Sequence, residues 1–256
     1  MRIVVIVLGL VLPLLAGGQP ARLVPATNMR TQLASAAVAV PVNPDARVGP
    51  VFLLGGIWHT CTGAVVHSAG GDLILTAAHC LANGFSTTFV PGFANTAAPS
   101  DIWKVDAVYL DPRWVTDRDP RADYAFARVS RAGGGSVEAQ AGSGLTLGTA
   151  PSPGSQVSVI GYPAGVGGAP IGCQTSTGIT RRGYPSFRCA GMVDGTSGAP
   201  WIVDSTVRGM IGGLDGGGCT PYVSYSAPFD ERTAALLAHA EAGGPGDAAP
   251  FAFGIC

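Results

Sequence analysis

The chain has 256 residues, and its 15 Lys and Arg nearly balance its 16 Asp and Glu, for a formal net charge of −1. This balance argues against a nucleic-acid partner, and a hydrophobic fraction of 47% excludes an intrinsically disordered chain. The 38 Gly and 20 Pro favour short strands joined by tight turns, so the composition predicts an all-β protein.

The first 18 residues have the pattern of a signal peptide. Arg2 supplies a positive charge, residues 3–16 are apolar, and the small residues at 16–18 suit signal peptidase. An apolar run interrupted by Pro13 is shorter than the roughly 20 residues that span a bilayer, which argues against a membrane anchor. No later segment is long and apolar enough to span either. We therefore expect a secreted protein with no membrane contact in its mature form.

Residues 19–47 are rich in Ala and Pro and show no sustained period, which indicates a pro-segment or a flexible leader. The main domain is expected at 48–256, where short β-like runs alternate with Gly, Pro, Asn or Ser. These runs lie at 51–54, 61–67, 72–76, 87–90, 102–109, 123–129, 156–161, 199–203, 206–211 and 222–226. The Gly-rich segment 133–155 is the best candidate for a crossing between two halves, and one helix is expected at about 228–242.

Six cysteines follow the predicted signal, and export would place them where thiols oxidise. They are Cys61, Cys80, Cys173, Cys189, Cys219 and Cys256. The even count fits three disulfides, and the sequence alone leaves 15 pairings open. No paired C-x-x-C or H-x-x-x-H spacing occurs, so a zinc site is not expected.

Three short strings carry residues of catalytic character. L-I-L-T-A-A-H-C-L places His79 just after a strand, R-A-D-Y-A-F-A-R-V places Asp123 at the start of an apolar strand, and G-M-V-D-G-T-S-G-A-P-W-I-V places Ser197 between glycines. A serine hydroxyl becomes a useful nucleophile when an imidazole accepts its proton, and a carboxylate on the other ring nitrogen stabilises the imidazolium. The strings thus supply a nucleophile, a base and an orienting acid.

The glycines around Ser197 add a second feature. Gly195 and Gly198 let the backbone turn sharply, so the N–H groups of Gly195 and Ser197 are candidates for an oxyanion hole. Taken singly, a residue such as His79 is more often a structural histidine, and one such as Asp123 is more often a turn or strand cap. A G-T-S-G string is more often a plain tight turn. Their joint occurrence favours the catalytic interpretation.

T-A-A-H-C, D-Y-A-F and G-x-S-G-x-P, in this order, resemble the chymotrypsin-like serine proteases. C-T-G-A-V-V at 61–66 and G-Y-P-A-G at 161–165 further resemble the secreted bacterial branch that includes the glutamyl endopeptidases. The resemblance implies two packed six-stranded antiparallel β-barrels with a C-terminal helix and a His79, Asp123 and Ser197 triad in the cleft between them. It also implies a secreted endopeptidase that acts on protein or peptide substrates, needs no metal or organic cofactor and works as a monomer.

The resemblance also guides the disulfides. Cys61 is expected to pair with Cys80 across a predicted hairpin that the family closes in the same way, and Cys173 with Cys189 across another hairpin. Elimination leaves Cys219 with Cys256. Two positions depart from the family pattern: Thr196 stands where animal digestive members have an Asp, and Ala199 replaces a common glycine.

In the family, the pocket for the side chain before the cleaved bond is built from residues just before the nucleophile and from the strand and loop that follow it. The resemblance assigns this pocket to Gly191, Met192, Val193, Ile211, Gly212, Gly213 and Leu214, with Tyr225 across its base. A preference for basic side chains needs a carboxylate at the position of Gly191, and glutamyl endopeptidases have a histidine at that of Ile211. We therefore expect cleavage after medium or large uncharged side chains, unless Asp194 or Asp215 turns inward.

Two alternatives remain at this point. A non-catalytic binding or adhesion protein on the same scaffold usually lacks a triad residue, whereas all three are present here. An esterase-type acyl hydrolase would use the same machinery, and the sequence does not separate it from a peptidase.

Overall fold

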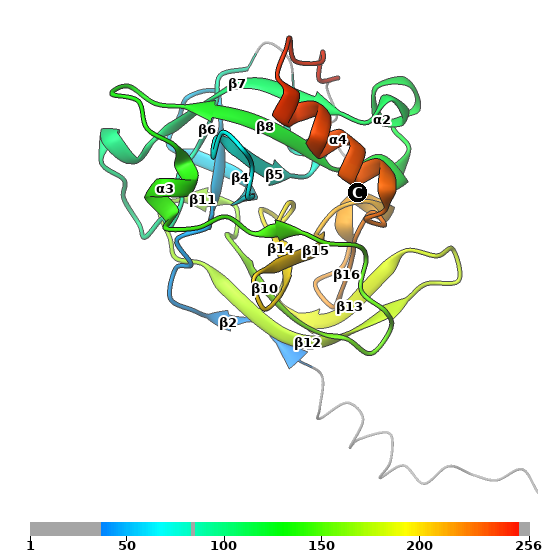
Figure 1. Cartoon of the computed structure of the whole chain (residues 1–256). Coiled ribbons are helices and arrows are strands. Elements are labelled where there is room, and N and C mark those ends of the chain that lie inside the picture. The colour runs from blue at the N-terminus through cyan, green and yellow to red at the C-terminus, as the bar shows by residue number, and fades with distance from the viewer. Residues whose placement is uncertain (1–36, 83–84, 251–256) are drawn as a thin grey trace, which may run out of the picture. The chain divides into compact units, whose positions relative to one another are not determined.

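The structure is a computed structural model that describes residues 37–82 and 85–250 (Figure 1). Most of these residues form short β-strands in two sheets, and the helices among them are few. The mostly β architecture agrees with the composition. No helix in the described part of the chain is long and apolar enough to cross a membrane.

The first sheet contains a closed six-stranded barrel. Its strands run in the order β4-β3-β6-β7-β8-β5, all antiparallel, and the barrel closes because β5 also pairs with β4. Their bounds are β3 Val48–Leu53, β4 Trp58–Val65, β5 Leu73–Thr76, β6 Thr87–Phe89, β7 Trp103–Leu110 and β8 Ala125–Ser130. The short strand β11 (Gly165–Val166), which comes from the second half of the chain, extends this sheet beside β4.

Large apolar side chains fill the interior of this barrel. Val51, Val65, Ile74, Phe89 and Trp103 are each completely buried there. Each buried side chain of this size stabilises the fold by roughly 1.5–3 kcal/mol relative to an exposed one. This packing makes the barrel a rigid support for the loops at its ends.

The second sheet comes mainly from the second half of the chain. Its path runs β1-β13-β12-β10-β14-β15-β9, while β16 pairs with β13 and β2 pairs with β12. Its strands are β10 Gln156–Gly161, β12 Ile171–Ile179, β13 Pro185–Ala190, β14 Pro200–Val203, β15 Thr206–Met210 and β16 Val223–Tyr225, with the short strands β1 Ala37–Val38, β2 Val40–Pro41 and β9 Thr146–Leu147. The strand pairings of the described residues do not join β15 to β16, so closure of a second barrel stays a prediction.

Residues 37–42 run along the second sheet. β1 lies parallel to β13, and β2 lies antiparallel to β12. The N–H of Ala39 donates to the C=O of Ala190 at 2.8 Å, and that of Val42 donates to Pro170 at 3.1 Å. The end of the predicted leader is therefore paired with the folded domain. Removal of that leader by processing stays a prediction.

The predicted crossing at 133–155 connects β8 of the first barrel to β10 of the second sheet. It contains the short helix α3 (Val137–Ala141) as well as β9. A second short helix, α2 (Pro112–Asp117), precedes β8. The sequence predicts only one helix, and it misses these two because they are too short to show helical periodicity. Side chains cap both: Asp111 accepts from Arg113 N–H and Ser136 from Ala139 N–H.

The expected C-terminal helix is α4 (Glu231–Ala242), within the predicted 228–242. Asp230 starts it with a capping box to Thr233, which satisfies backbone N–H groups at its first turn. Although α4 follows the second sheet in the chain, it packs against β7 and β8 of the first barrel (Figure 1). It thereby ties the end of the described chain to the first half.

Each of the ten predicted β-like runs overlaps a strand of the structure. The ten runs do not include β12 and β13, but the hairpin expected between Cys173 and Cys189 is confirmed, because β12 contains Cys173, β13 contains Cys189 and the two strands pair antiparallel. Their sequences I-G-C-Q-T-S-T-G-I and P-S-F-R-C-A mix polar and apolar residues, because many of their side chains are at least partly exposed. A strand with a solvated face has a weaker apolar signal than one buried on both sides.

Candidate active site

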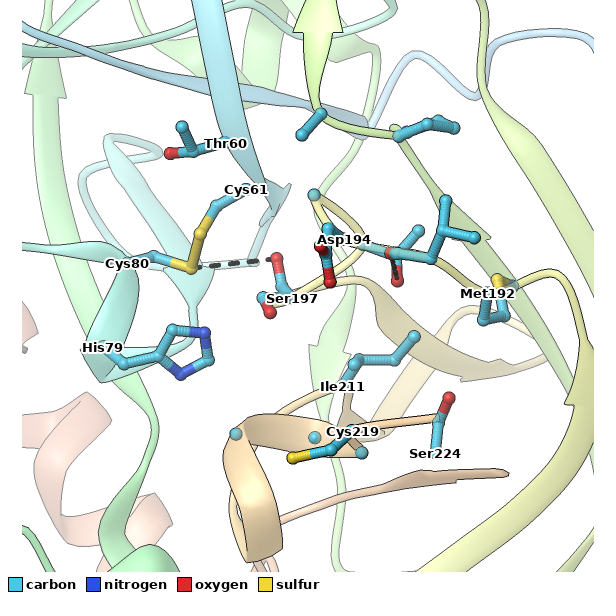
Figure 2. A pocket seen from close by; sticks show the side chains of 18 of the residues that line it. Thr60, Cys61, His79, Cys80, Met192, Asp194, Ser197, Ile211, Cys219 and Ser224 are labelled. Atoms are coloured by element: carbon cyan, nitrogen blue, oxygen red, sulfur yellow. Dashed lines mark hydrogen bonds between the residues drawn. A yellow bond between two sulfur atoms is a disulfide. The ribbon is translucent and has the colours of Figure 1, made fainter. Parts of the chain in front are cut away.

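One large cavity of about 1010 Å³ contains both His79 and Ser197 (Figure 2). His79 belongs to a single turn of 3-10 helix, Ala78–Cys80, that follows β5 of the first barrel. Ser197 lies in the loop between β13 and β14 of the second sheet. The two halves of the chain therefore each contribute one of these side chains to the same pocket.

Asp123 is buried beneath His79. The carboxylate is only 1% exposed, and its Oδ2 lies 2.8 Å from Nδ1 of the imidazole. Its Oδ1 accepts the backbone N–H of His79 at 3.0 Å, so the carboxylate holds both the ring and the main chain of that residue. A bond at Nδ1 leaves Nε2 as the ring nitrogen available to the pocket.

A third donor completes the surroundings of this carboxylate. The backbone N–H of Gly213 donates to Asp123 Oδ2 at 2.7 Å. Burial disfavours the charged carboxylate, but attraction to His79 and hydrogen bonds from His79 and Gly213 outweigh it, so the pKa of Asp123 lies below its usual value of 3.8. The group is therefore a buried, fully hydrogen-bonded anion near neutral pH.

The loop around Ser197 requires glycine at two positions. Gly195 has φ +92° and Gly198 has φ +85°, both in the left-handed region that favours glycine. A Cβ at Gly195 would overlap the backbone nitrogen of Ala164, and one at Gly198 would overlap the C=O of Thr62. The sharp turn that presents Ser197 thus depends on the absence of side chains on either side of it.

The backbone of this loop is oriented by its neighbours. The C=O of Asp194 accepts from the N–H of Ala164 at 2.8 Å. Because a trans peptide directs its C=O and N–H in opposite directions, the N–H of Gly195 points away from Ala164. Among the described residues, neither this N–H nor that of Ser197 donates to a protein acceptor. Both groups are therefore available to a ligand.

The structure contains two disulfides that match predicted pairs. Cys61 is joined to Cys80, and Cys173 to Cys189. Cys256 lies outside the described residues, so its predicted pairing with Cys219 stays a prediction. In the described part of the chain, Cys61, His79 and Cys80 form the one cluster with metal-ligand atoms, but its two sulfurs form a disulfide and are not thiolate ligands.

Only some of the residues predicted for the specificity pocket line this cavity. Met192, Val193 and Ile211 line it, with Met192 and Ile211 on the far side of Ser197 from His79 (Figure 2). The remaining predicted residues are not among its lining residues: Gly191, Gly212, Gly213, Leu214 and Tyr225. Asp194 lines the cavity, whereas Asp215 does not.

The chain path after β15 explains this difference. A Cβ at Gly212 would lie 3.3 Å from Asp123 Oδ2, so this residue packs over the buried carboxylate instead of facing the pocket. Leu214 turns into the interior and is 7% exposed. The wall is formed further along the chain, by Gly216, Gly217, Gly218, Cys219, Thr220, Pro221 and Ser224.

Comparison with protein families decides the identity of the fold. Residues 61–212 match the model of the trypsin-like peptidase domain, and this span includes His79, Asp123 and Ser197. The chain belongs to the trypsin-like peptidase family. It is therefore a serine protease, which is a hydrolase. None of the curated proteins matches the sequence.

Solved structures of serine proteases share the fold of this trypsin-like peptidase. The protease Anisep from Arthrobacter nicotinovorans is 24% identical, covers 80% of this chain and 100% of its own, and has a TM-score of 0.69. The thermostable serine protease AL20 from an extremophilic microorganism is 23% identical, with 78% and 99% covered and a TM-score of 0.68. A Glu endopeptidase is 14% identical, with 82% and 99% covered and a TM-score of 0.63.

The trypsin-like peptidase has its own arrangement at the residue before Ser197. Thr196 is 2% exposed, and its hydroxyl donates to the C=O of Val193 at 2.7 Å. The backbone N–H of Thr196 donates to the same C=O at 3.1 Å. Thr196 thus makes its hydrogen bonds within its own loop. Unlike the Asp at this position in the animal digestive members, it has no carboxylate that could bind a chain terminus.

Proposed function

We propose that this serine protease is a secreted endopeptidase that cleaves peptide bonds through an acyl-enzyme on Ser197. One observation carries the proposal: the buried Asp123 carboxylate lies 2.8 Å from Nδ1 of His79, whose ring lies in the same pocket as Ser197. This arrangement supports the role of His79 as general base and that of Asp123 as its orienting anion.

In the first half of the proposed reaction, Ser197 Oγ attacks the carbonyl carbon of the scissile bond. His79 Nε2 accepts the hydroxyl proton, and Asp123 stabilises the imidazolium that forms. The carbonyl π bond opens and its electron pair moves to the oxygen. The N–H groups of Gly195 and Ser197 would bind this oxyanion, and one such donor is worth about 3 kcal/mol in the transition state.

Collapse of this tetrahedral intermediate breaks the C–N bond. The leaving amine takes the proton from His79, and the acyl group remains on Ser197 as an ester. A water molecule then repeats the sequence: His79 removes its proton, the oxygen attacks the ester carbon, and Ser197 departs with the proton as the acid product is released. No redox or metal-assisted step is needed to balance these bonds.

Export is the second part of the proposal. A signal peptide at 1–18 would direct the chain out of the cytoplasm, and the disulfides Cys61–Cys80 and Cys173–Cys189 support an oxidising destination. Because residues 37–42 pair with the second sheet, we place the start of the stable peptidase unit before Ala37. Processing of the predicted 19–47 leader would then end upstream of this residue and not at Val48.

We also propose that the second sheet closes into the expected six-stranded barrel. Its pairings already run β16-β13-β12-β10-β14-β15, so only contact between β15 and β16 is needed. The Met210 N–H donates to Ser226 Oγ at 3.1 Å, and the Gly212 N–H to the C=O of Tyr225 at 3.0 Å. These bonds link the end of β15 to the end of β16 and support closure.

The apolar part of the pocket supports cleavage after medium or large uncharged side chains, and Asp194 is the one acidic group among the described lining residues that could instead bind a basic side chain. Met192, Val193 and Ile211 present apolar surface, and no Lys or Arg is among the described lining residues to bind a carboxylate. Burying an unpaired charge costs several kcal/mol, so an acidic side chain would bind poorly. A peptide-library profile checks this preference; cleavage mainly after Glu, or mainly after Arg and Lys, would contradict it.

Labelling with a fluorophosphonate, which phosphorylates an activated serine, tests the proposed function. The purified chain should be labelled at Ser197 and should cleave peptides, whereas Ser197→Ala should do neither. Absence of labelling would favour a non-catalytic binding protein. Labelling with hydrolysis of esters but not of peptides would favour an acyl hydrolase.

A further inference from the structure

Thr62 lies at the junction of three segments that are distant in the sequence. It belongs to β4 of the first barrel and is completely buried. Its neighbours are Tyr162, which follows β10 of the second sheet, and the loop that carries Ser197. The mechanism proposed above makes no use of this side chain.

The hydroxyl of Thr62 makes two hydrogen bonds. It accepts the backbone N–H of Tyr162 at 2.9 Å and donates to the C=O of Gly195, also at 2.9 Å. A hydroxyl is the one small uncharged group that both donates and accepts through a single atom. Here it joins a strand of the second sheet to the nucleophile loop inside the protein.

The main chain of Thr62 holds the same loop and the first barrel. Its N–H donates to the C=O of Ser197 at 2.7 Å, and its C=O accepts the hydroxyl of Thr76 at 2.7 Å. Its neighbour Cys61 is joined to Cys80, which directly follows His79. Consecutive residues of β4 therefore fix the position of the imidazole and that of the nucleophile loop.

The hydrogen bond from the Thr62 hydroxyl to the C=O of Gly195 restrains the Gly195–Thr196 peptide. This bond matters because that peptide lies next to the proposed oxyanion donors. Gly195 lies between two anchored carbonyls: that of Asp194 is held by Ala164, and its own is held by Thr62. Because glycine has no Cβ, the peptide planes on both sides of Gly195 could rotate readily in the absence of such bonds. Holding both carbonyls fixes the directions of the Gly195 N–H and of the Gly195–Thr196 peptide.

We propose that Thr62 is a positioning residue whose hydroxyl fixes the oxyanion-binding amides of the Ser197 loop relative to His79. The inference rests on the proposed function, because it concerns the reaction assigned to Ser197. Thr62 itself does not touch the substrate or the reacting atoms. It acts by keeping the Gly195 peptide in the orientation that the transition state needs.

The test compares Thr62→Val with Thr62→Ser. Valine keeps the shape but leaves a buried C=O and a buried N–H without their partner, whereas serine keeps the hydroxyl. Thr62→Val should lower kcat by about 10- to 100-fold with KM changed less than about threefold, and Thr62→Ser should stay within about threefold of the wild type. If the valine variant is not recovered folded, Thr62→Ala provides the same comparison with a smaller side chain.

A readout specific to the transition state separates positioning from simple stabilisation. A peptide aldehyde forms a tetrahedral adduct with an oxyanion, and the matching peptide alcohol does not. Thr62→Val should weaken aldehyde binding by a factor similar to the loss in kcat while leaving alcohol binding unchanged. Thr177→Val is a matched control, because Thr177 is a buried threonine of β12 that donates to the C=O of Ser152 at 2.8 Å and does not line the pocket. It should lower thermal stability without changing kcat.

Three results would overturn the proposal for Thr62: an unchanged kcat in a folded Thr62→Val or Thr62→Ala, an equal loss of aldehyde and alcohol binding, or a loss in Thr62→Ser as large as that in Thr62→Val. A failure of the proposed function itself is recognised separately. In that case the wild-type chain would show no turnover that depends on Ser197, before any Thr62 variant is compared.

Discussion

The Asp123 carboxylate binds His79 at two points: Oδ1 accepts the backbone N–H at 3.0 Å, and Oδ2 lies 2.8 Å from Nδ1 of the ring. A buried anion held in this way stabilises the imidazole ring in one orientation and one tautomer. The site also requires a group that only accepts hydrogen bonds, because each hydrogen-bonding partner of the carboxylate is a donor.

Asp123→Asn should therefore lower kcat strongly. An asparagine amide would place its N–H groups opposite the N–H of Gly213 or of His79. His79 would then adopt the wrong tautomer, and the same change in a Ser-His-Asp protease lowers kcat about 10⁴-fold. Steady-state hydrolysis of a peptide substrate measures the loss. The matched control is Asp119→Asn, at a part-exposed residue that caps a turn through Arg121 N–H, and it should keep full activity. A loss below about tenfold in Asp123→Asn would contradict the assignment.

The second prediction concerns coupling between His79 and Ser197. Ser197→Ala and His79→Ala should each abolish nearly all turnover, because each removes part of a single proton-transfer unit. The double variant should be little slower than either single variant. Circular dichroism and thermal melting should show that all three remain folded. If the two losses multiplied, the residues would act independently and the proposed relay would be rejected.

The third prediction concerns stability in acid. Burial opposes ionisation of Asp45, Asp111 and Asp123, but bonds from Arg47, from Arg113 and Tyr124, and from His79 and Gly213, respectively, keep the pKa of each carboxyl below 3.8. Below that value the unfolded chain binds more protons than the folded one, so the free energy of unfolding rises with pH. The stabilisation is fully present above about pH 3.8 and is lost as the pH falls through the folded-state values.

Urea unfolding at a series of pH values between about 6 and 2.5 measures this effect. The wild-type free energy of unfolding should fall steeply in the lower part of the range. Asp111→Asn should be less stable near pH 6 and should show a shallower fall, because it lacks one of the three carboxylates. A wild-type stability that stays constant down to about pH 2.5 would argue against this account.

The fourth prediction concerns the segment before Val48. Ala37 pairs with Cys189 and Val38 with Ala190, directly before Gly191 and the pocket residue Met192. A chain that begins at Val48 loses these contacts, and the hydrogen bonds of Ala39 and Val42 alone are worth about 1–3 kcal/mol. It should therefore melt several degrees below a chain that begins at residue 36, and it should have a higher KM.

Thermal melting and peptide hydrolysis of the two chains provide the comparison, and N-terminal sequencing of the exported protein shows which form occurs. Equal stability and equal KM would mean that the segment is dispensable. A natural start at Val48 with full activity would support the leader boundary predicted from composition and reject the one proposed from the strand pairing.

The catalytic candidates were predictable because their signals are local. His79, Asp123 and Ser197 each lie in a short string whose residue types are required by the chemistry, and the glycines beside Ser197 are required by its turn. The ten β-like runs were predictable for a similar reason, since burial selects apolar residues along the strand itself. The polar strands β12 and β13 lacked that apolar signal, and only the hairpin expected between Cys173 and Cys189 pointed to them.

The amino-acid order alone thus determines the mostly β class, the cysteine content and the residue types of the proposed reaction. Only the tertiary structure decides which backbone groups surround them. Gly213 N–H reaches Asp123, and Thr62 reaches Gly195 across 133 residues, because the packing of the two sheets brings these segments together. The pocket wall shifts to residues 216–221 because Asp215, at φ +49°, turns the chain after Leu214 has entered the interior. Such contacts depend on the packing of distant segments, and no local pattern in the sequence records them.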